Sequence, residues 1–290
     1  MKAIGIVARP DLAQATVVRD LAVWLLERDA TVWVEERTAA LVDGALPAAV
    51  HRASGSEVAR AADALVVLGG DGTLLAASRL LEKPTPVLGV NFGSLGFLTE
   101  VSLHELYPTL ASVLDDSYRS EERRLLHAVL RRRGADHASA DVLNDVVVTK
   151  ASLARIIELD VSVDGVFVSA FRADGLIVSS PTGSTAYNLA AGGPILHPAL
   201  GAVVLTPISP HMLTNRPLVI RDDAIVEVRL RATREGDVHV SFDGQGGVPL
   251  ESDDVVTVTR SPRTLRLVKT PDRDYFEVLR TKLKWGGPAS

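Results

Sequence analysis

Short apolar runs alternate with longer amphipathic stretches over the first 120 residues of the chain. The apolar runs predict buried strands, and the stretches between them predict helices. This alternation is typical of a parallel sheet with covering helices, so we expect an α/β domain over residues 1–120. The expected strands are Ala3–Ala8, Thr31–Glu35, Ala64–Leu68 and Pro86–Val90, and the expected helices lie near 13–28, 73–81 and 103–114.

After Glu121 the pattern changes to alternating β-branched and polar residues separated by turn dipeptides such as Asp164-Gly165. This pattern is typical of antiparallel strands, so we expect a β-rich domain over residues 121–267. Its expected strands are 126–133, 141–149, 156–163, 166–171, 176–179, 203–206, 225–231, 238–242, 255–259 and 264–267. The tail 268–290 carries apolar residues that need a surface to cover, so we expect it to dock back on the first domain.

Composition narrows the classes of protein. The 290 residues are 47% hydrophobic, enough for one large or two modest domains. A net charge of −5 argues against a general nucleic-acid partner. The chain has no cysteine for disulfides or thiolate zinc sites. Its apolar runs are too short for an export signal or a membrane span, so we expect a soluble cytoplasmic protein without a membrane partner.

A glycine-rich turn, Gly69-Gly70-Asp71-Gly72-Thr73, stands between a predicted strand and a predicted helix. Glycines let phosphate oxygens approach backbone N–H groups, and a helix N-terminus favours negative charge. The turn predicts a phosphate site, although an ordinary turn capped by Asp71 also explains it. A second glycine cluster, Asn91–Leu98, follows the next strand. Both loops would lie at the carboxyl ends of strands, where open α/β sheets bind ligands, although a close helix–sheet crossing also needs small residues.

The second domain contributes Leu143–Val146, which we expect within a strand, and the polar segment Arg172–Tyr187. The segment offers many hydrogen-bond donors and acceptors, and Tyr187 offers a ring on which a base could stack. A nucleotide site is one interpretation, and a polar loop that caps the next helix is the other. The sequence has no G-x-G-x-x-G after the first strand, no P-loop, no H-E-x-x-H and no G-x-S-x-G.

In their order along the chain, these motifs resemble those of the NAD kinase family. The match comprises Gly69–Gly72, Asn91–Leu98, Asn144-Asp145, Asp174–Tyr187 with Gly192–Ile195, and Pro210-His211 to Arg216–Leu218. The GGDG turn alone also occurs in lipid kinases of the diacylglycerol kinase type and in phosphofructokinases, so the combination carries the resemblance. It implies a Rossmann-like α/β domain followed by a β-sandwich-like domain, and a homodimer or homotetramer.

The resemblance implies transfer of the γ-phosphoryl group of ATP, or of polyphosphate, to the 2′-hydroxyl of the adenosine ribose of NAD, giving NADP. Asp71 would be the general base for that hydroxyl, and Asn144 and Asp145 would hold an adenosine moiety, where many relatives have Glu in place of Asp. The full set of implied substrate- and nucleotide-binding residues is Gly69, Gly70, Gly72, Phe92, Asn144, Asp145, Arg155, Arg172, Asp174, Thr182, Thr185, Ala186, Tyr187, Asn188, Leu189, Ala190 and Gln245.

Phosphoryl transfer requires mainly alignment and charge neutralisation. We expect a divalent metal ion, Mg²⁺ carried with ATP, and no protein metal ligand, because the sequence shows no dedicated carboxylate cage. Two rival interpretations are a lipid kinase and a nucleotide sensor that binds NAD or NADP without turnover. The first would need membrane attraction, yet no basic amphipathic stretch occurs. The second would not require a carboxylate at Asp71.

Overall fold

The computed structural model describes residues 1–42, 46–93, 95–151, 156–231, 237–270 and 273–285. The chain forms two compact units, one of Met1–Glu122 with Leu265–Ser290 and one of Arg123–Thr264. The first unit is α/β and the second is β-rich, which confirms the predicted fold class. Among the described residues, no helix is both long enough and apolar enough to cross a bilayer.

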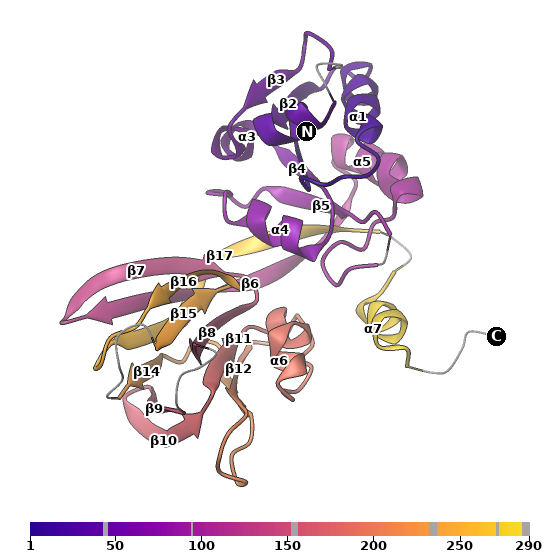
Figure 1. Ribbon diagram of the computed structural model, residues 1–290. Coiled ribbons are helices and arrows are strands. Elements are labelled where there is room, and N and C mark those ends of the chain that lie inside the picture. Colours follow the sequence, from indigo (N-terminus) through magenta and orange to yellow (C-terminus); the bar gives the residue numbers. More distant parts are fainter. Residues whose placement is uncertain (43–45, 94, 152–155, 232–236, 271–272, 286–290) are drawn as a thin grey trace. The chain divides into compact units, whose positions relative to one another are not determined.

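The first unit contains a parallel sheet with the strand order β17-β5-β4-β1-β2-β3 (Figure 1). The order reverses between β1 and β4, because β2 and β3 extend the sheet on one side of β1 while β4 and β5 extend it on the other. The strands are β1 (Ala3–Ala8), β2 (Thr31–Glu35), β3 (His51–Ala53), β4 (Ala64–Leu68), β5 (Pro86–Val90) and the end of β17 (Val255–Lys269). The helices are α1 (Thr16–Leu26), α2 (Glu36–Ala39), η1 (Ala40–Val42), α3 (Gly55–Ala61), α4 (Asp71–Ser78), η2 (Leu103–Glu105), α5 (Leu106–Leu114) and α7 (Tyr275–Leu283).

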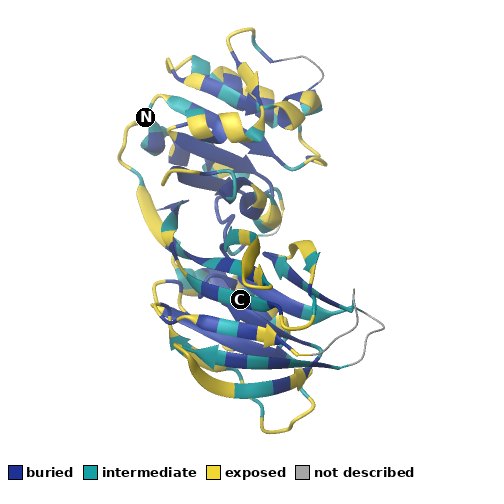
Figure 2. Ribbon diagram, turned by 90° about the vertical axis from the view of Figure 1, so that its left-hand side faces the viewer, coloured by how far each residue is buried: buried dark blue, intermediate teal, exposed yellow. Residues whose placement is uncertain are grey.

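Helices cover both faces of this sheet, and its strands β1, β4 and β5 are almost wholly buried (Figure 2). On one face, Ile4 and Ile6 of β1 pack in one cluster with Leu21 of α1 and Leu110 of α5. On the other face, a Cβ at Gly5 of β1 would lie 2.8 Å from the side chain of Val58 in α3. Because helices pack on both faces of these strands, residues on both faces are apolar. Each strand therefore appears in the sequence as a continuous apolar run.

The second unit is a sandwich of two sheets. One has the order β13-β12-β11-β8-β15-β16, and the other contains β10-β9-β14-β17 together with β6 and β7. Side chains from both sheets, such as Val148, Leu159 and Val240, share one buried cluster. The elements are β6 (Arg119–Arg132), β7 (Ala135–Val142), β8 (Asp145–Lys150), β9 (Ile157–Val163), β10 (Val166–Ala173), β11 (Gly175–Ser179), η3 (Gly183–Thr185), α6 (Tyr187–Ala190), β12 (Ala202–Ile208), β13 (Leu218–Arg221), β14 (Val226–Leu230), β15 (Val238–Phe242) and β16 (Gln245–Pro249).

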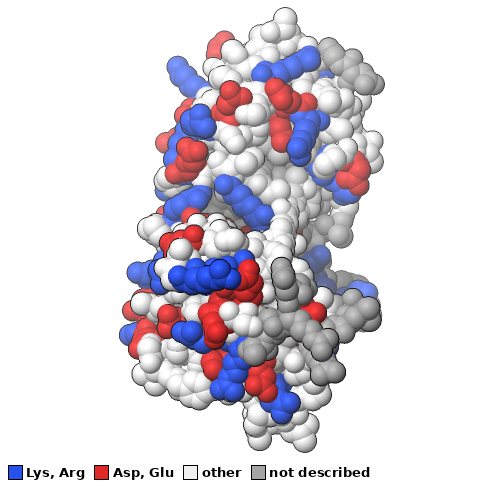
Figure 3. Space-filling model, turned by 60° about the vertical axis from the view of Figure 1, so that its left-hand side comes forward, with Lys and Arg blue, Asp and Glu red and all other residues white. Residues whose placement is uncertain are grey.

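Basic and acidic side chains are interspersed on the face drawn in Figure 3. In the second unit, ion pairs also join neighbouring strands, as between Arg231 Nε and Asp160 Oδ2 at 2.8 Å. The mixed charge on this face differs from the continuous basic surface that nucleic-acid binding favours.

Some elements differ from the prediction for local reasons. The expected strand 141–149 is interrupted, because Leu143 and Asn144 lie between β7 and β8. Helix α4 begins at Asp71, two residues earlier than expected, and ends at Ser78. The strands 255–259 and 264–267 are one continuous strand, β17. Helix α3 was not predicted, although Ser54 and Glu57 form a capping box at its start.

A buried ion pair holds the end of β17 to the segment that follows β5. Lys269 Nζ lies 2.5 Å from Glu100 Oε2, and the two side chains are 8% and 3% exposed. Glu121 also approaches Lys269 Nζ, at 3.7 Å. Removing one member of such a pair leaves a buried charge without its main partner, which is strongly destabilising.

We expect Lys269→Met to lower the free energy of unfolding by about 3–5 kcal/mol, because the Glu100 carboxylate would stay buried without its cation. Urea denaturation followed by circular dichroism would measure the change. The matched control is Arg131→Met, whose pair with Asp136 is exposed and whose loss should change stability by less than about 1 kcal/mol. Equal effects of the two substitutions would contradict the assignment.

Candidate functional site

Asp71 lies in the first turn of α4 and binds the segment that follows β5. Its Oδ2 accepts a hydrogen bond from the N–H of Phe97 at 2.9 Å, and its Oδ1 accepts from the N–H groups of Leu98 and Thr99, both at 3.0 Å. The Thr99 hydroxyl also donates to Oδ1 at 3.0 Å. The carboxylate therefore holds the loop in place, a contact that the sequence did not reveal.

The glycines around Asp71 have two different uses. A Cβ at Gly96 would lie 2.2 Å from Asp71 Oδ1, so the loop can close on the carboxylate only with glycine there. Gly69 is also closely packed, because a Cβ would lie 2.5 Å from Thr73 Oγ1. At Gly70 and Gly72, by contrast, no described atom outside the adjoining backbone lies within 4 Å of an added Cβ. Their backbone is open to an approaching ligand, as a phosphate loop requires.

In the second unit, Asp243 plays a part similar to that of Asp71. It lies between β15 and β16 with a φ of 50°. Its carboxylate accepts hydrogen bonds from the N–H groups of Leu143 at 3.0 Å, Asn144 at 2.6 Å and Asp145 at 3.1 Å. These bonds occupy the N–H groups that a continuous strand would use, which explains the interruption between β7 and β8.

The Asp145 side chain is buried beside Asp243 and is 4% exposed. Burial, reinforced by the negative charge of Asp243, raises the pKa of Asp145 to about 7. A buried carboxyl that titrates near neutral pH destabilises the folded protein when it is charged. Such groups are concentrated at functional sites, which supports the expectation that Asn144-Asp145 belongs to one.

The polar segment after β11 packs directly on Asn144. The N–H of Ser180 donates to the Asn144 carbonyl oxygen at 2.9 Å, and the Ser180 hydroxyl donates to the Leu143 carbonyl oxygen at 2.5 Å. A Cβ at Gly183 would lie 2.2 Å from the Asn144 carbonyl oxygen, so this approach requires glycine. The structure thus brings the segment around Thr182 together with Asn144.

Residues 182–190 differ in how accessible they are. Thr182 is buried, Thr185, Ala186 and Leu189 are half-buried, and Tyr187 and Ala190 are exposed. Asn188 is fully buried, and its amide bonds the carbonyl oxygens of Ser184 and Pro194 and the hydroxyl of Thr206. Asn188 therefore holds the segment in shape, and a ligand contact by its side chain stays a prediction.

The remaining expected residues lie at several places. Arg172 Nε is 3.1 Å from Glu158 Oε1, and Asp174 Oδ1 is 2.8 Å from Lys150 Nζ, so both charges are balanced across neighbouring strands. Gln245 is the exposed first residue of β16, Phe92 packs against the core of the first unit, and Arg155 lies outside the described residues.

Sequence reasoning missed Thr99 and the role of Asp243. The Thr99 hydroxyl and N–H both bind Asp71, but Thr99 follows the glycine cluster and belongs to no motif. Asp243-Gly244 is a common turn dipeptide, which conceals the function of the carboxylate. A signal for Asp243 is its position in a turn directly after the short apolar strand β15, but its binding partners lie about 100 residues away in the sequence.

Comparison with known proteins agrees with these two units. The family model of the ATP-NAD kinase N-terminal domain matches residues 4–118, and that of the C-terminal domain matches residues 143–270. The chain is 46% identical over 288 residues to the NAD kinase of Syntrophotalea carbinolica, covering 99% of each chain. It is 53% identical over 232 residues to the NAD kinase of Citrifermentans bemidjiense, covering 80% of this chain and 81% of that relative.

Two solved structures share the fold. Yeast NADH kinase complexed with NADH aligns with a TM-score of 0.92 and 22% identity, over 99% of this chain and 88% of that chain. An NAD kinase from Archaeoglobus fulgidus in complex with ATP aligns with a TM-score of 0.73 and 25% identity, over 97% of this chain and 99% of that chain. An α/β unit with a glycine-rich turn, joined to a β-sandwich, defines a class of two-domain kinases. Within that class, this chain belongs to the ATP-NAD kinase family.

The raised pKa of Asp145 predicts how stability depends on pH. Because the folded-state pKa of about 7 exceeds the ordinary value of 3.8, the folded protein binds more protons than the unfolded chain between these values. The penalty of the charged carboxyl is therefore absent below about pH 4, grows as the pH rises, and is complete above about pH 7.

We expect Asp145→Asn to unfold at higher urea concentration than the wild type at pH 8, by a free energy on the order of 3 kcal/mol, and at nearly the same concentration at pH 4. Parallel urea titrations at these two pH values would test this. The exposed Asp136→Asn is the matched control and should show no such pH-dependent gain. A gain for Asp145→Asn that is independent of pH would contradict the assignment.

Proposed function

We propose that this chain is an NAD kinase, which transfers the γ-phosphoryl group of ATP or polyphosphate to the 2′-hydroxyl of the adenosine ribose of NAD and produces NADP. The observation that carries the proposal is the anchored Asp71 carboxylate beside the open backbone of Gly70 and Gly72. This combination provides a fixed acid–base group beside a phosphate-binding turn. Family membership in both units supports it.

Asp71 is proposed to orient the acceptor hydroxyl and to take its proton as the oxygen attacks the γ-phosphorus. The bond from that phosphorus to the bridging oxygen breaks, and ADP or the shortened polyphosphate leaves. Its four hydrogen bonds prevent the side chain from rotating, so the carboxylate position is set before substrate arrives. The open N–H groups near Gly70 and Gly72 would receive phosphate oxygens. Acid–base help of this kind contributes about 10²–10⁴-fold in rate.

In the second unit, Asn144 and Asp145 are proposed to hold the adenosine moiety, with Tyr187 as a stacking surface. The support for this role is the buried, partly neutral carboxyl of Asp145 and the exposed ring of Tyr187. A protonated Asp145 can donate a hydrogen bond as well as accept one, which suits a hydroxyl or a ring nitrogen.

A divalent metal, Mg²⁺, is proposed to arrive with the triphosphate, whose oxygens supply its ligands. In the described part of the chain, no cluster of three or more His, Asp or Glu residues is placed to form a dedicated cage. When bound, the ion neutralises phosphate charge. The homodimer or homotetramer and the cytoplasmic location stay predictions.

The first experiment supplies NAD and Mg-ATP to the purified protein and couples NADP to an NADP-specific dehydrogenase. We expect NADP formation in the wild type and a loss of kcat of about 10²–10⁴-fold in Asp71→Asn, with NAD affinity retained. Near wild-type kcat in Asp71→Asn would remove this residue from the mechanism. NAD binding without any NADP would favour the sensor interpretation.

Asp71→Asn can also disturb the loop, because the new side-chain NH₂ group can face the N–H of Phe97 in place of a carboxylate oxygen. Thr99→Val is the control for this disruption. Thr99→Val removes the hydroxyl bond to Asp71 but keeps the carboxylate. We expect a much smaller loss of kcat, below about tenfold. Equal losses in the two variants would assign the effect of Asp71→Asn to the loop.

A further inference from the structure

The tail of the chain is attached to the loop that Asp71 binds. Glu100 directly follows Thr99, whose N–H and hydroxyl both donate to the Asp71 carboxylate. The guanidinium of Arg273 donates from Nη1 to the carbonyl oxygen of Glu100, and Lys269 Nζ binds the carboxylate of the same residue. Glu100 is 2% exposed, and the absence of water around it strengthens charged interactions such as these.

Arg273 also reaches the start of helix α5. Its Nη2 lies 3.3 Å from Oε1 of Glu105, whose other oxygen accepts a hydrogen bond from the N–H of Ser102 at 2.8 Å. Although burial acts in the opposite direction, hydrogen bonds from Ser102 and the charge of Arg273 hold the pKa of Glu105 below its ordinary value. One guanidinium therefore joins the end of the loop to α5, whose Leu106 and Leu110 lie in the core of the unit.

A second contact joins the tail to the other end of the loop. Lys282 Nζ in α7 lies 5.6 Å from the centroid of the Phe97 ring, within the range of a cation–π interaction. The N–H of Phe97 donates to Asp71 Oδ2 at 2.9 Å. Helix α7 itself is docked, because Val278 and Leu279 are buried. Contacts with the tail therefore lie at both ends of the run of three N–H groups that the carboxylate binds.

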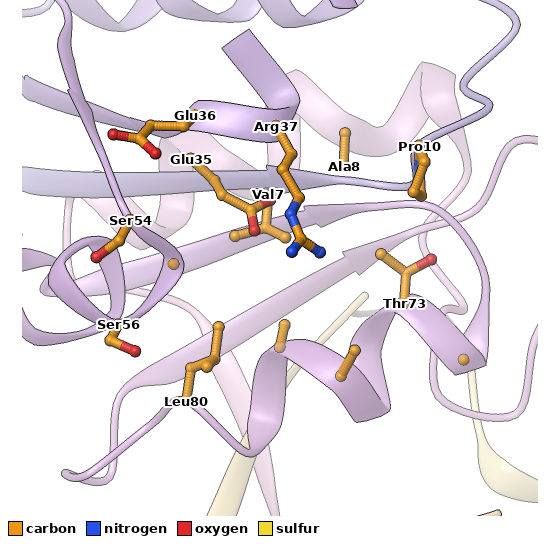
Figure 4. A pocket seen from close by; sticks show the side chains of 14 residues that line it. Val7, Ala8, Pro10, Glu35, Glu36, Arg37, Ser54, Ser56, Thr73 and Leu80 are labelled. Atoms are coloured by element: carbon orange, nitrogen blue, oxygen red, sulfur yellow. The ribbon is translucent and has the colours of Figure 1, made fainter. Parts of the chain in front are cut away.

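The cavity beside the glycine-rich turn is lined by other parts of the unit. Its volume is about 650 Å³, and Gly72 and Thr73 contribute to its lining. Figure 4 shows Thr73 and Leu80 among the lining side chains, and Leu80 is the last described residue along the chain that lines it. A substitution in the tail should therefore leave phosphate binding at the turn nearly intact and alter how the Asp71 carboxylate is held.

We propose that Arg273 is a positioning residue for the Asp71 carboxylate. By holding Glu100, it fixes the N–H groups that orient the carboxylate before substrate binds. The rate of phosphoryl transfer depends on such alignment, because a displacement of about 1 Å can lower a rate about 10²-fold. The inference rests on the proposed function, since it explains how the base of that reaction is kept in position.

Three substitutions separate positioning from stability. Arg273→Met removes the donors but keeps an apolar stem, and Arg273→Lys keeps the positive charge without the planar guanidinium. Lys282→Met removes the second contact at a half-buried position, where misfolding is not expected. The matched control is Arg280→Met, because Arg280 is an exposed arginine of α7 in the same tail. Thermal unfolding would verify that all four variants fold.

Hydrogen exchange followed by mass spectrometry reports on the loop without any turnover. We expect the peptide that covers residues 97–101 to exchange about tenfold faster in Arg273→Met, and faster to a smaller extent in Lys282→Met, because the N–H groups bound to Asp71 open more often. Peptides of the second unit, such as 175–179, should exchange as in the wild type. Arg280→Met should match the wild type throughout.

The coupled NADP assay measures the consequence for the rate. We expect Arg273→Met to lower kcat about tenfold while KM for NAD and for ATP stays within about twofold, because the contact acts on the reacting group and not on the substrates. Arg273→Lys should recover part of the lost kcat, and Arg280→Met should retain it all. If Arg273→Met does not fold, Lys282→Met supplies the same comparison with a smaller loss.

Unchanged exchange at residues 97–101 in both Arg273→Met and Lys282→Met would overturn the proposal. So would faster exchange with kcat retained, faster exchange throughout the chain, or a rise in KM for NAD alone, which would assign the tail to substrate binding. If the wild type forms no NADP but exchange of the loop changes as expected, the proposed function fails and the attachment of the loop to the tail stands. If NADP forms but neither exchange nor kcat changes, only the positioning role fails.

Discussion

Asp71 and Asp243 each bind consecutive backbone N–H groups of a loop and thereby fix its conformation. Asp71 binds residues 97–99 in the first unit, and Asp243 binds residues 143–145 in the second. A carboxylate suits this task because its two oxygens accept several hydrogen bonds and its charge strengthens them. Without it, these N–H groups would need new partners, and each one left buried and unpaired is destabilising. The two sites therefore share one device for fixing irregular backbone.

Irregular backbone of this kind allows the second unit to retain a carboxyl group whose burial lowers the stability of the fold. Asp145 follows the loop that Asp243 holds, and its burial beside a second carboxylate is unfavourable when it is charged. The packing around it leaves little freedom to relax, because Gly183 contacts Asn144 closely and the buried Asn188 side chain bonds Ser184, Pro194 and Thr206. Proteins keep such unfavourable groups mainly where function needs them, at the expense of stability elsewhere.

The sequence predicts the regular strands of this fold well and the irregular contacts poorly. The bounds of β1, β2, β4, β5 and β15 match the expected ranges, because a buried strand is a short run of apolar residues between turn signals. Strands β3, β13 and β16 were missed, since each is short and β16 contains two glycines and a proline. The GGDG turn and its neighbours could be recognised by residue type and order. The partners of Asp243, however, depend on contacts between segments about 100 residues apart in the sequence.

Strand β17 also bears on how the protein forms on the ribosome. Its last residues pair with β5 in the first unit, whereas Val255–Val258 pair with β14 in the second. Leu267 leaves the ribosome only after every residue of the second unit has been made. The β5 edge of the N-terminal sheet therefore stays unpaired while the whole inserted unit is synthesised. An unpaired strand edge is a site at which nascent chains can aggregate. Co-translational folding should thus complete the inserted sandwich before the domain that begins the chain.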